Sequence, residues 1–184
     1  MQLTKIDVIT DSVLGRKVKA LYTAAFPKEE RVPWWLLRLH SARRGIDLTA
    51  WMDGDIFCGF TASVTVEGLH FVLFFAIDQN LRGQGYGSAI LTAIKEEHKT
   101  VALNVEPLIE SAPNYEQRLQ RFEFYRKNGF VDTGYHVWEV GGKFRVLSTA
   151  AELDVPVYQK VFLKLTCGLW KVRVEPAGKK ERAL

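Results

Sequence analysis

Three glycines at alternate positions, Gly83, Gly85 and Gly87, lie in the segment DQNLRGQGYGSAIL (78–91), between an apolar run and a helical pattern. Glycine loses more conformational freedom on folding than any other residue, so this spacing weakens the backbone unless the backbone itself has a use. Successive N–H groups in such a loop, together with the first turn of the next helix, form a concave site for anions. The segment therefore predicts a ligand that carries phosphate, and a glycine-rich turn without a ligand is the alternative.

Two common phosphate motifs fit this segment poorly. A P-loop needs Lys followed by Ser or Thr after its last glycine, but Gly87 is followed by Ser88 and Ala89. The dinucleotide fingerprint would need glycine at position 88 and a parallel doubly wound sheet, whereas hairpin-like strands precede this loop.

Composition fits a globular protein with an anionic ligand. The chain has 184 residues, 47% of them hydrophobic, and a net charge of +4. A solvated surface of mixed charge is the preferred interpretation of this charge, and attraction of a phosphate-rich cofactor is the alternative. Nucleic-acid binding is not expected, because dense basic clusters occur only at Arg43–Arg44 and in GKKER (178–182). No signal peptide and no uncharged apolar run of about 18 residues is found, so we expect a cytoplasmic protein without a membrane partner.

Other residue types that perform chemistry give weaker signals. Cys58 and Cys167 lie in apolar surroundings and are expected to be buried thiols without a disulfide. No Gly-x-Ser-x-Gly elbow is present, which disfavours serine hydrolysis. No metal is expected, because the histidines lack metal-ligand spacing; they are His40, His70, His98 and His136.

Apolar periodicity and turn residues predict an alternation of helices and strands in a single domain, 1–174, followed by a flexible tail, 175–184. Strands are expected at 4–9, 46–52, 56–66, 70–78, 101–107, 130–140, 143–148 and 170–174. Helices are expected from Asp11 or Ser12 with Val13, Leu14, Val18, Leu21 and Tyr22 on one side, then at 34–45, at 88–98, within 111–130 and at 154–165.

Two motifs in this order resemble the GNAT superfamily of acyl-CoA-dependent N-acetyltransferases. The residues RGQGYG (82–87) match its R/Q-x-x-G-x-G/A pattern, and FYRKNGF (124–130) is similar to its later Y-x-x-x-G-F segment. The resemblance covers about residues 4–148. It implies an α/β (α+β) fold with a mixed, mostly antiparallel central sheet, helices on both faces and a splay between the fourth and fifth strands.

The resemblance also implies how acetyl-CoA is bound. The backbone of Phe75 and Ile77 would pair with the pantetheine arm, and the N–H of Ile77 would serve as an oxyanion donor. Asn114 is a candidate for a cofactor asparagine that the family carries seven residues before its tyrosine, where this chain has Arg118. Backbone amides of residues 82 to 88 would hold the pyrophosphate; these are Arg82, Gly83, Gln84, Gly85, Tyr86, Gly87 and Ser88.

The implied activity is transfer of an acetyl group to a primary amine by direct attack. Tyr125 aligns with the family's general-acid tyrosine, and Glu106 is the candidate base, with Glu67 or His70 as alternatives. Cys58 is expected to lie far from the thioester, which disfavours an acyl-enzyme. A longer-chain acyltransferase and a non-catalytic acyl-CoA sensor remain alternatives.

The acceptor side is harder to infer. Trp34 and Trp35, at the start of the second expected helix, either line a substrate pocket or belong to the core, and the core is the preferred interpretation. The acceptor is a small molecule or a peptide. The addition at 149–174 either covers a sheet edge or mediates a homodimer.

Overall fold

The computed structural model describes residues 1–42, 46–139 and 142–178. Within these residues the chain forms two compact units, one of residues 1–65 and 72–97 and the other of residues 66–71 and 98–184. The expectation of a single domain at 1–174 stays a prediction. Several sequence features lie outside the described residues: Arg43–Arg44, the helix end at Gly45, the turn residue Gly141 and nearly all of GKKER.

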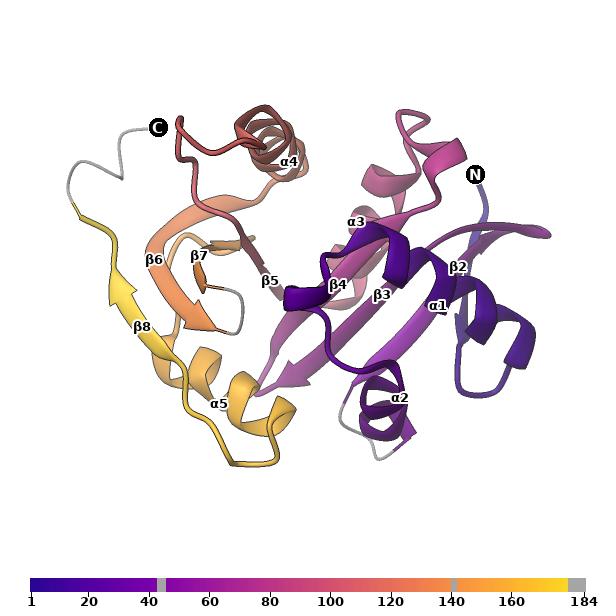
Figure 1. The fold of residues 1–184 in the computed structure, drawn as a ribbon, viewed down its shortest axis with the longest axis horizontal. Coiled ribbons are helices and arrows are strands. Elements are labelled where there is room, and N and C mark those ends of the chain that lie inside the picture. The colour runs from indigo at the N-terminus through magenta and orange to yellow at the C-terminus, as the bar shows by residue number, and fades with distance from the viewer. Residues whose placement is uncertain (43–45, 140–141, 179–184) are drawn as a thin grey trace. The chain divides into compact units, whose positions relative to one another are not determined.

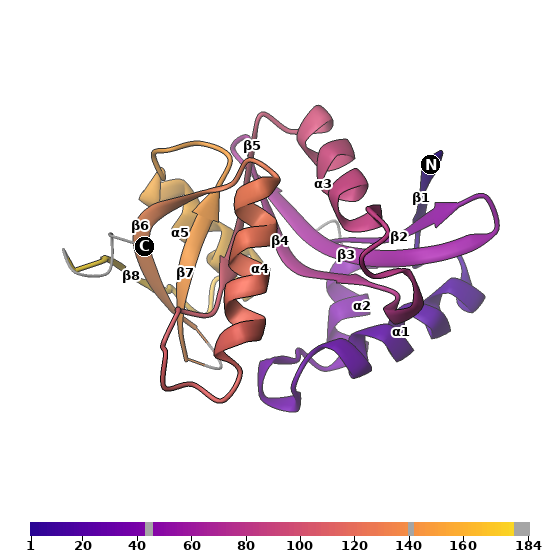
Figure 2. The same cartoon turned by 90° about the horizontal axis from the view of Figure 1, so that it is seen from above.

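The first unit is a sheet with helices on both faces. Its strand order is β1-β2-β3-β4, and both β1–β2 and β2–β3 are antiparallel. Figure 2 shows α3 on one face of these strands and α1 and α2 on the other. The elements are β1 (Leu3–Asp7), α1 (Ser12–Ala25), the 3₁₀ turn η1 (Lys28–Glu30), α2 (Trp34–Ala42), β2 (Asp47–Asp53), β3 (Ile56–Val66), β4 (Leu69–Ile77), the 3₁₀ turn η2 (Gln79–Leu81) and α3 (Tyr86–Glu97).

Helix α1 begins where the sequence predicts, but its buried face is narrower than the predicted one. The Asp11 carboxylate accepts the N–H groups of Val13 and Leu14 at 2.8 and 2.9 Å, which satisfies donors that have no acceptor inside the helix. Leu14, Val18 and Tyr22, each four residues apart, form the buried stripe. Val13 was expected on this stripe but is 52% exposed, because it lies one position to the side of the four-residue spacing.

The second unit contains the six elements from β5 to β8. Its strand order is β4-β5-β7-β6-β8, to which β4 contributes residues 69–71. Strands β4 and β5 are parallel, and the pairs β5–β7, β6–β7 and β6–β8 are antiparallel. Figure 1 shows α4 and α5 on opposite sides of these strands. The elements are β5 (Thr100–Val105), α4 (Tyr115–Lys127), β6 (Val131–Glu139), β7 (Gly142–Ser148), α5 (Val155–Leu165) and β8 (Arg173–Pro176).

This arrangement confirms the predicted fold class, an α+β fold with a mixed, mostly antiparallel sheet. The C-terminal addition supplies α5 and the edge strand β8, which pairs with β6. Asp154 caps α5 by accepting the N–H of Val157 at 3.1 Å, as predicted from its position before Pro156. Within the described residues, none of the helices is both long and apolar enough to cross a membrane.

Each unit has its own apolar core, and the two cysteines differ. Cys58 is buried as expected. Cys167 is exposed, so its predicted burial is wrong; it lies just after the last turn of α5 with φ +53°. Core side chains of the first unit include Val8, Val18, Tyr22, Leu37, Leu48, Phe60, Ile90 and Leu91, and those of the second include Phe71, Val101, Phe130, Val137, Val146, Leu147, Tyr158 and Val161.

Candidate active site

The glycine loop connects β4 to α3 in the first unit. Asp78 organises its start, because the Asp78 carboxylate accepts the N–H of Asn80 at 2.9 Å and its carbonyl accepts the N–H of Leu81 at 2.9 Å. Gly83 and Gly85 then adopt φ values of +76° and +88°, which residues other than glycine rarely adopt. A Cβ at Gly83 would meet nothing within 4 Å. Backbone conformation, rather than crowding inside the protein, therefore requires glycine at these two positions.

The loop presents backbone donors at the start of α3. The first backbone bond into the helix runs from Ala89 N–H to the Gly85 carbonyl at 3.0 Å. The preceding amides of Tyr86, Gly87 and Ser88 lie in the first turn, where N–H groups lack acceptors inside the helix. The N–H of Gln84 makes only a long turn bond of 3.4 Å to Leu81. This geometry suits an anion at the helix N-terminus.

Tyr86 also anchors the loop through its side chain, which the sequence analysis did not anticipate. Its hydroxyl donates to Asp53 Oδ2 at 3.1 Å, and Asp53 Oδ1 accepts the N–H of Gln2 at 2.9 Å. The Gln2 amide and the Tyr86 hydroxyl hold the pKa of the Asp53 carboxyl below its usual value, and the Asp53 hydrogen bond raises the pKa of Tyr86. The start of α3 is thus tied to the end of β2.

Strand β3 also approaches the end of β4 closely, and the sequence-based predictions did not include this contact. A Cβ on Gly59 would lie 2.3 Å from the carbonyl oxygen of Ala76 and 3.1 Å from Cα of Ile77, so only glycine fits. The β2–β3 register skips Cys58, which marks a bulge there. An isolated glycine inside a strand pattern was the available sequence signal. Gly59 therefore sets the position of the strand end that carries Ile77.

The bulge places Cys58 beside the end of β4, because the Cys58 carbonyl accepts the N–H of Asp78 at 2.9 Å. The expected distance between Cys58 and the thioester stays a prediction. Burial, and then the nearby Asp53 carboxylate, raise the pKa of the Cys58 thiol. Because the thiolate is the nucleophilic form, this environment still disfavours an acyl-enzyme at Cys58.

Phe75 and Ile77 are half-buried and alternate with buried Phe74 and Ala76 along β4. The Phe74 ring lies 4.9 Å from both Tyr22 and Phe26 of the α1 side, measured between ring centroids. Side chains alternate between the faces of a strand, so those of Phe75 and Ile77 point away from α1. The roles assigned to their backbone groups remain predictions.

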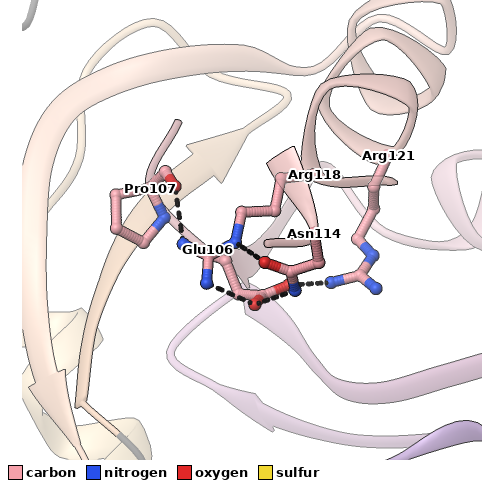
Figure 3. Close-up of polar contacts among 5 residues, drawn as sticks. All are labelled: Glu106, Pro107, Asn114, Arg118 and Arg121. Atoms are coloured by element: carbon pink, nitrogen blue, oxygen red, sulfur yellow. Dashed lines mark hydrogen bonds and ion pairs between the residues drawn. The ribbon is translucent and has the colours of Figure 1, made fainter. Parts of the chain in front are cut away.

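In the second unit, Glu106 lies at the centre of a polar cluster (Figure 3). Glu106 Oε1 accepts a hydrogen bond from Asn114 Nδ2 at 3.1 Å and lies 3.1 Å from Arg118 Nη2. Glu106 Oε2 accepts from Arg121 Nη1 at 2.6 Å. Arg118 also donates to Asn114 Oδ1 at 2.7 Å and to the Pro107 carbonyl at 3.0 Å. Both predicted residues, Glu106 and Asn114, therefore belong to one network that joins the end of β5 to α4.

The network gives a physical use for Arg118, where the resemblance leads us to expect asparagine. An asparagine side chain could not bridge Asn114, Glu106 and Pro107 together, whereas the several donors of a guanidinium can. The Glu106 side chain is only 16% exposed. Two arginines and one amide compensate the loss of water around this carboxylate.

Tyr125 lies on the buried face of α4, and its ring centroid is 5.7 Å from that of Phe130. Burial raises the pKa of Tyr125 to about 12, and the charge of Arg121 opposes this shift. The phenol therefore keeps its proton at neutral pH, as a general acid must.

The alternative bases have other partners in the second unit. Lys160 Nζ lies 2.7 and 2.9 Å from the two carboxylate oxygens of Glu67. The His70 ring stacks on that of His98, with centroids 3.8 Å apart. Among the described residues, no group of three or more His, Cys, Asp or Glu side chains is placed to hold a metal ion.

Trp34 and Trp35, at the start of α2, are not both core residues. Trp35 is 67% exposed, so the preferred core interpretation is wrong for it. Trp34 is half-buried, and its ring centroid lies 6.1 Å from that of Tyr22.

The residues predicted for the site divide between the two units. Those expected to hold the cofactor, Phe75, Ile77 and the loop 82–88, belong to the first unit. Glu106, Asn114 and Tyr125 belong to the second. The sequence motifs thus identified two structured regions, one made of backbone amides and one of side chains.

Comparison with known proteins gives a match over the part of the chain that contains both regions. The family model described as "Acetyltransferase (GNAT) domain" matches residues 47–132. The Bacillus subtilis (strain 168) protein YjbC, whose name gives acetyltransferase as a provisional activity, is 30% identical over 95 residues. That match covers 45% of this chain and 46% of YjbC, so the chain matches less than half of this relative's length.

Solved structures share the fold. A Bacteroides thetaiotaomicron protein, described provisionally as a GNAT-family acetyltransferase, has a TM-score of 0.68 and 22% identity, covering 92% of this chain and 100% of its own. An aminoglycoside 6'-N-acetyltransferase complexed with coenzyme A has a TM-score of 0.63 and 16% identity, covering 80% of this chain and 96% of its own. The motifs, the fold and these comparisons together lead to one conclusion: residues 47–132 match the GNAT acetyltransferase domain, and the chain has the fold of that superfamily.

Proposed function

We propose that this protein transfers an acetyl group from acetyl-CoA to a primary amine. The glycine loop carries the proposal, because Gly83 and Gly85 take left-handed conformations immediately before the first turn of α3. The amine nitrogen attacks the thioester carbonyl carbon directly. The new N–C bond forms, the C–S bond breaks, the nitrogen loses a proton, and the sulfur leaves as a thiol. The products are an N-acetylated amine and CoA.

Backbone groups of the first unit bind the cofactor in this proposal. The amides of residues 82–88 hold the pyrophosphate, and the first turn of α3 adds its partial positive charge. The backbone of Phe75 and Ile77 pairs with the pantetheine arm. The N–H of Ile77 stabilises the oxyanion of the tetrahedral intermediate.

Side chains of the second unit move the protons. Tyr125 donates its proton to the leaving sulfur, a role that its raised pKa allows at neutral pH. Glu106 is the proposed base, directly or through a water molecule. Its contacts set a condition on this role, because a carboxylate oxygen accepts about two hydrogen bonds. Oε1 already faces Asn114 and Arg118, so the amine proton would move to Oε2, which Arg121 also contacts. Asn114 then acts through Glu106, in addition to its proposed place beside the cofactor.

Thermal unfolding with and without acetyl-CoA tests the cofactor assignment. A ligand at about 100 times its Kd that binds only the folded state stabilises it by about 2.7 kcal/mol, which raises Tm visibly. Gly85→Asp should abolish the rise because it places a carboxylate against the pyrophosphate. Gly68→Asp is the matched control, since Gly68 has φ +86° and open space around it in the β3–β4 turn. An undiminished rise in Gly85→Asp, or no rise in the wild-type protein with any acyl-CoA, contradicts the proposal.

Thiol release in the presence of amines tests the activity. An aminoglycoside and a pentapeptide with a free amino terminus cover the small-molecule and peptide acceptors. Tyr125→Phe should lower kcat about 10²- to 10⁴-fold and leave acetyl-CoA affinity unchanged, because only the acidic hydroxyl is removed. Unchanged kcat would remove Tyr125 as the acid. Binding of acetyl-CoA without transfer to any amine would favour the sensor alternative.

A further inference from the structure

The two helices on one face of the first unit contain no acidic residue. Helix α1 carries Arg16, Lys17 and Lys19, and α2 carries Arg38. Helices α3 and α4, by contrast, each contain both signs of charge. Residues 11–42 contain six basic and three acidic residues, a net charge of +3, whereas the whole chain has +4. Most of the net positive charge of the protein therefore lies in this helical layer.

The outer side of α1 combines cations with apolar side chains. Tyr22 faces the sheet, with its ring centroid 6.0 Å from that of Phe60 in β3, and Leu14 and Val18 are buried on the same side of the helix. The residues on the opposite side point away from the sheet. They are all exposed, and they are Val13, Arg16, Lys17, Ala20 and Ala24.

Helix α2 contacts α1 and presents two large apolar side chains outward. The ring centroid of Trp34 lies 6.1 Å from that of Tyr22, which joins the start of α2 to α1. Trp35, the next residue, is 67% exposed, and Leu39, one turn later, is 37% exposed. Arg38 is exposed on the same side of the helix. Figure 2 shows both helices on one face of the first unit.

The cations of these outer sides are not neutralised within the described part of the chain. There, Arg16, Lys17 and Arg38 form no ion pair, whereas Lys5 of the same unit pairs with Glu97. Cations that lie together without intervening carboxylates produce a positive potential, which attracts a polyanion. The exposed apolar side chains gain free energy only if the partner also removes them from water. The partner should therefore be both anionic and apolar.

We propose that the outer sides of α1 and α2 form a docking surface for a membrane that carries anionic lipids. Each Lys or Arg close to such a membrane adds to the affinity. Tryptophan and leucine favour the boundary between headgroups and acyl chains. The sequence analysis expected no membrane partner because no segment is long and apolar enough to span a bilayer, but a surface contact needs no spanning helix. The inference goes beyond the proposed acetyl transfer and does not depend on it.

A nucleic acid is the main competing polyanion, and it fits this surface less well. Base edges are read by Asn and Gln as well as by Arg, and α1 and α2 contain neither Asn nor Gln. A base could stack on Trp35, but the aliphatic side chains of Val13 and Leu39 would have no comparable contact. The boundary of a bilayer accommodates all three side chains.

Sedimentation with lipid vesicles tests the proposal. The full chain is mixed with phosphatidylcholine vesicles that either lack phosphatidylglycerol or contain about one third of it. Binding should require phosphatidylglycerol and should be lost at about 1 M salt, where the screening length falls to about 3 Å. The double variant Arg16→Gln with Lys17→Gln should bind these anionic vesicles about 10- to 30-fold more weakly.

A second double variant is the matched control. Lys99→Gln with Lys127→Gln removes the same charge from exposed positions of the second unit, so it should bind like the wild-type protein. Equal weakening in the two double variants would attribute binding to overall charge and would overturn the inference. Absence of binding to the anionic vesicles, or binding to a double-stranded RNA in their place, would also overturn it.

Tryptophan fluorescence locates the contact. Brominated lipids quench a tryptophan that enters the bilayer boundary, so Trp35→Phe should lose most of the quenching. Trp170→Phe changes an exposed tryptophan of the second unit and should keep it. Undiminished quenching in Trp35→Phe contradicts the proposed orientation of the two helices on the membrane. The thermal shift with acetyl-CoA should be the same in all these variants, so a failure of the proposed function would be seen separately.

Discussion

The two units hold their predicted site residues by different physical means. In the first unit the loop 82–88 is defined by backbone: left-handed glycines, a helix N-terminus and a strand end that Gly59 allows to approach β3. In the second unit the clusters around Glu106, Glu139 and Arg145 are defined by charges and amides that compensate one another. Single added carbons should therefore damage the first region, and single removed charges should damage the second.

The largest effect is expected from removing a buried charge in the second unit. The Arg145 guanidinium is paired with Asp132, and their side chains are 4% and 18% exposed. Asp132→Ala leaves a cation in the interior, which should lower the unfolding free energy by about 3–5 kcal/mol. Urea unfolding measures this change.

An exposed pair provides the control for this prediction. Lys5 and Glu97 in the first unit are nearly half exposed, so Glu97→Ala should cost no more than about 1 kcal/mol. Similar losses in both variants would show that burial does not decide the strength of these pairs.

The next effect tests the backbone side of the comparison. Gly59→Ala places a methyl group 2.3 Å from the Ala76 carbonyl oxygen, a contact that only backbone movement relieves. We expect a loss of about 3 kcal/mol. Gly15→Ala in α1 is the control, because its new Cβ would lie 3.8 Å from Val8 and alanine favours helix by about 1 kcal/mol. A neutral Gly59→Ala would mean that β3 and β4 separate easily at this point.

The backbone-defined region was the easier one to predict from sequence. Glycine spacing, an apolar strand before it and a helical pattern after it are local signals, and they located the loop 82–88 and the helix Tyr86–Glu97 within two residues. Caps at Asp11 and Asp154 were equally local. The family resemblance added Tyr125 through its motif position, and Glu106 was predicted from its place at the end of the fifth expected strand, which is also a local signal.

The side-chain clusters were not predictable in this way. Asn104, Glu139 and Tyr158 are up to 54 positions apart, and their hydrogen bonds depend on strand register and helix packing. Neither the partners of Glu106 nor the burial of Arg145 follows from composition or periodicity. The exposure of Cys167 was missed for a related reason, since apolar neighbours in the sequence do not determine whether a side chain is buried.

A smaller effect compares the tyrosines at alkaline pH. The pKa of Tyr125 is about 12 in the folded chain, against about 10 in an unfolded one. The unfolded state therefore loses its proton first as the pH rises, and the stabilisation present below pH 10 declines between about pH 10 and 12. From pH 8 to 11 the wild type should lose about 1.4 kcal/mol more than Tyr125→Phe.

Tyr22 extends this prediction to the first unit. Burial raises its pKa to about 12 as well, although its hydroxyl donates to the Val32 carbonyl, a backbone partner. Urea unfolding at pH 8 and 11 should therefore show that Tyr22→Phe, like Tyr125→Phe, loses less unfolding free energy than the wild type as the pH rises. A pH response identical in the wild type and both variants would mean that neither phenol is linked to folding.

The smallest effect separates backbone strain from ligand binding. Gly85→Ala and Gly68→Ala each force alanine into a left-handed conformation, with φ values of +88° and +86°, and each should cost about 1 kcal/mol in unfolding free energy. Only Gly85→Ala should also weaken acetyl-CoA binding, measured by calorimetry, because only that methyl group lies in the loop. Equal loss of acetyl-CoA affinity in both variants would attribute binding to global stability, and the loop would then lose its assignment as the pyrophosphate site.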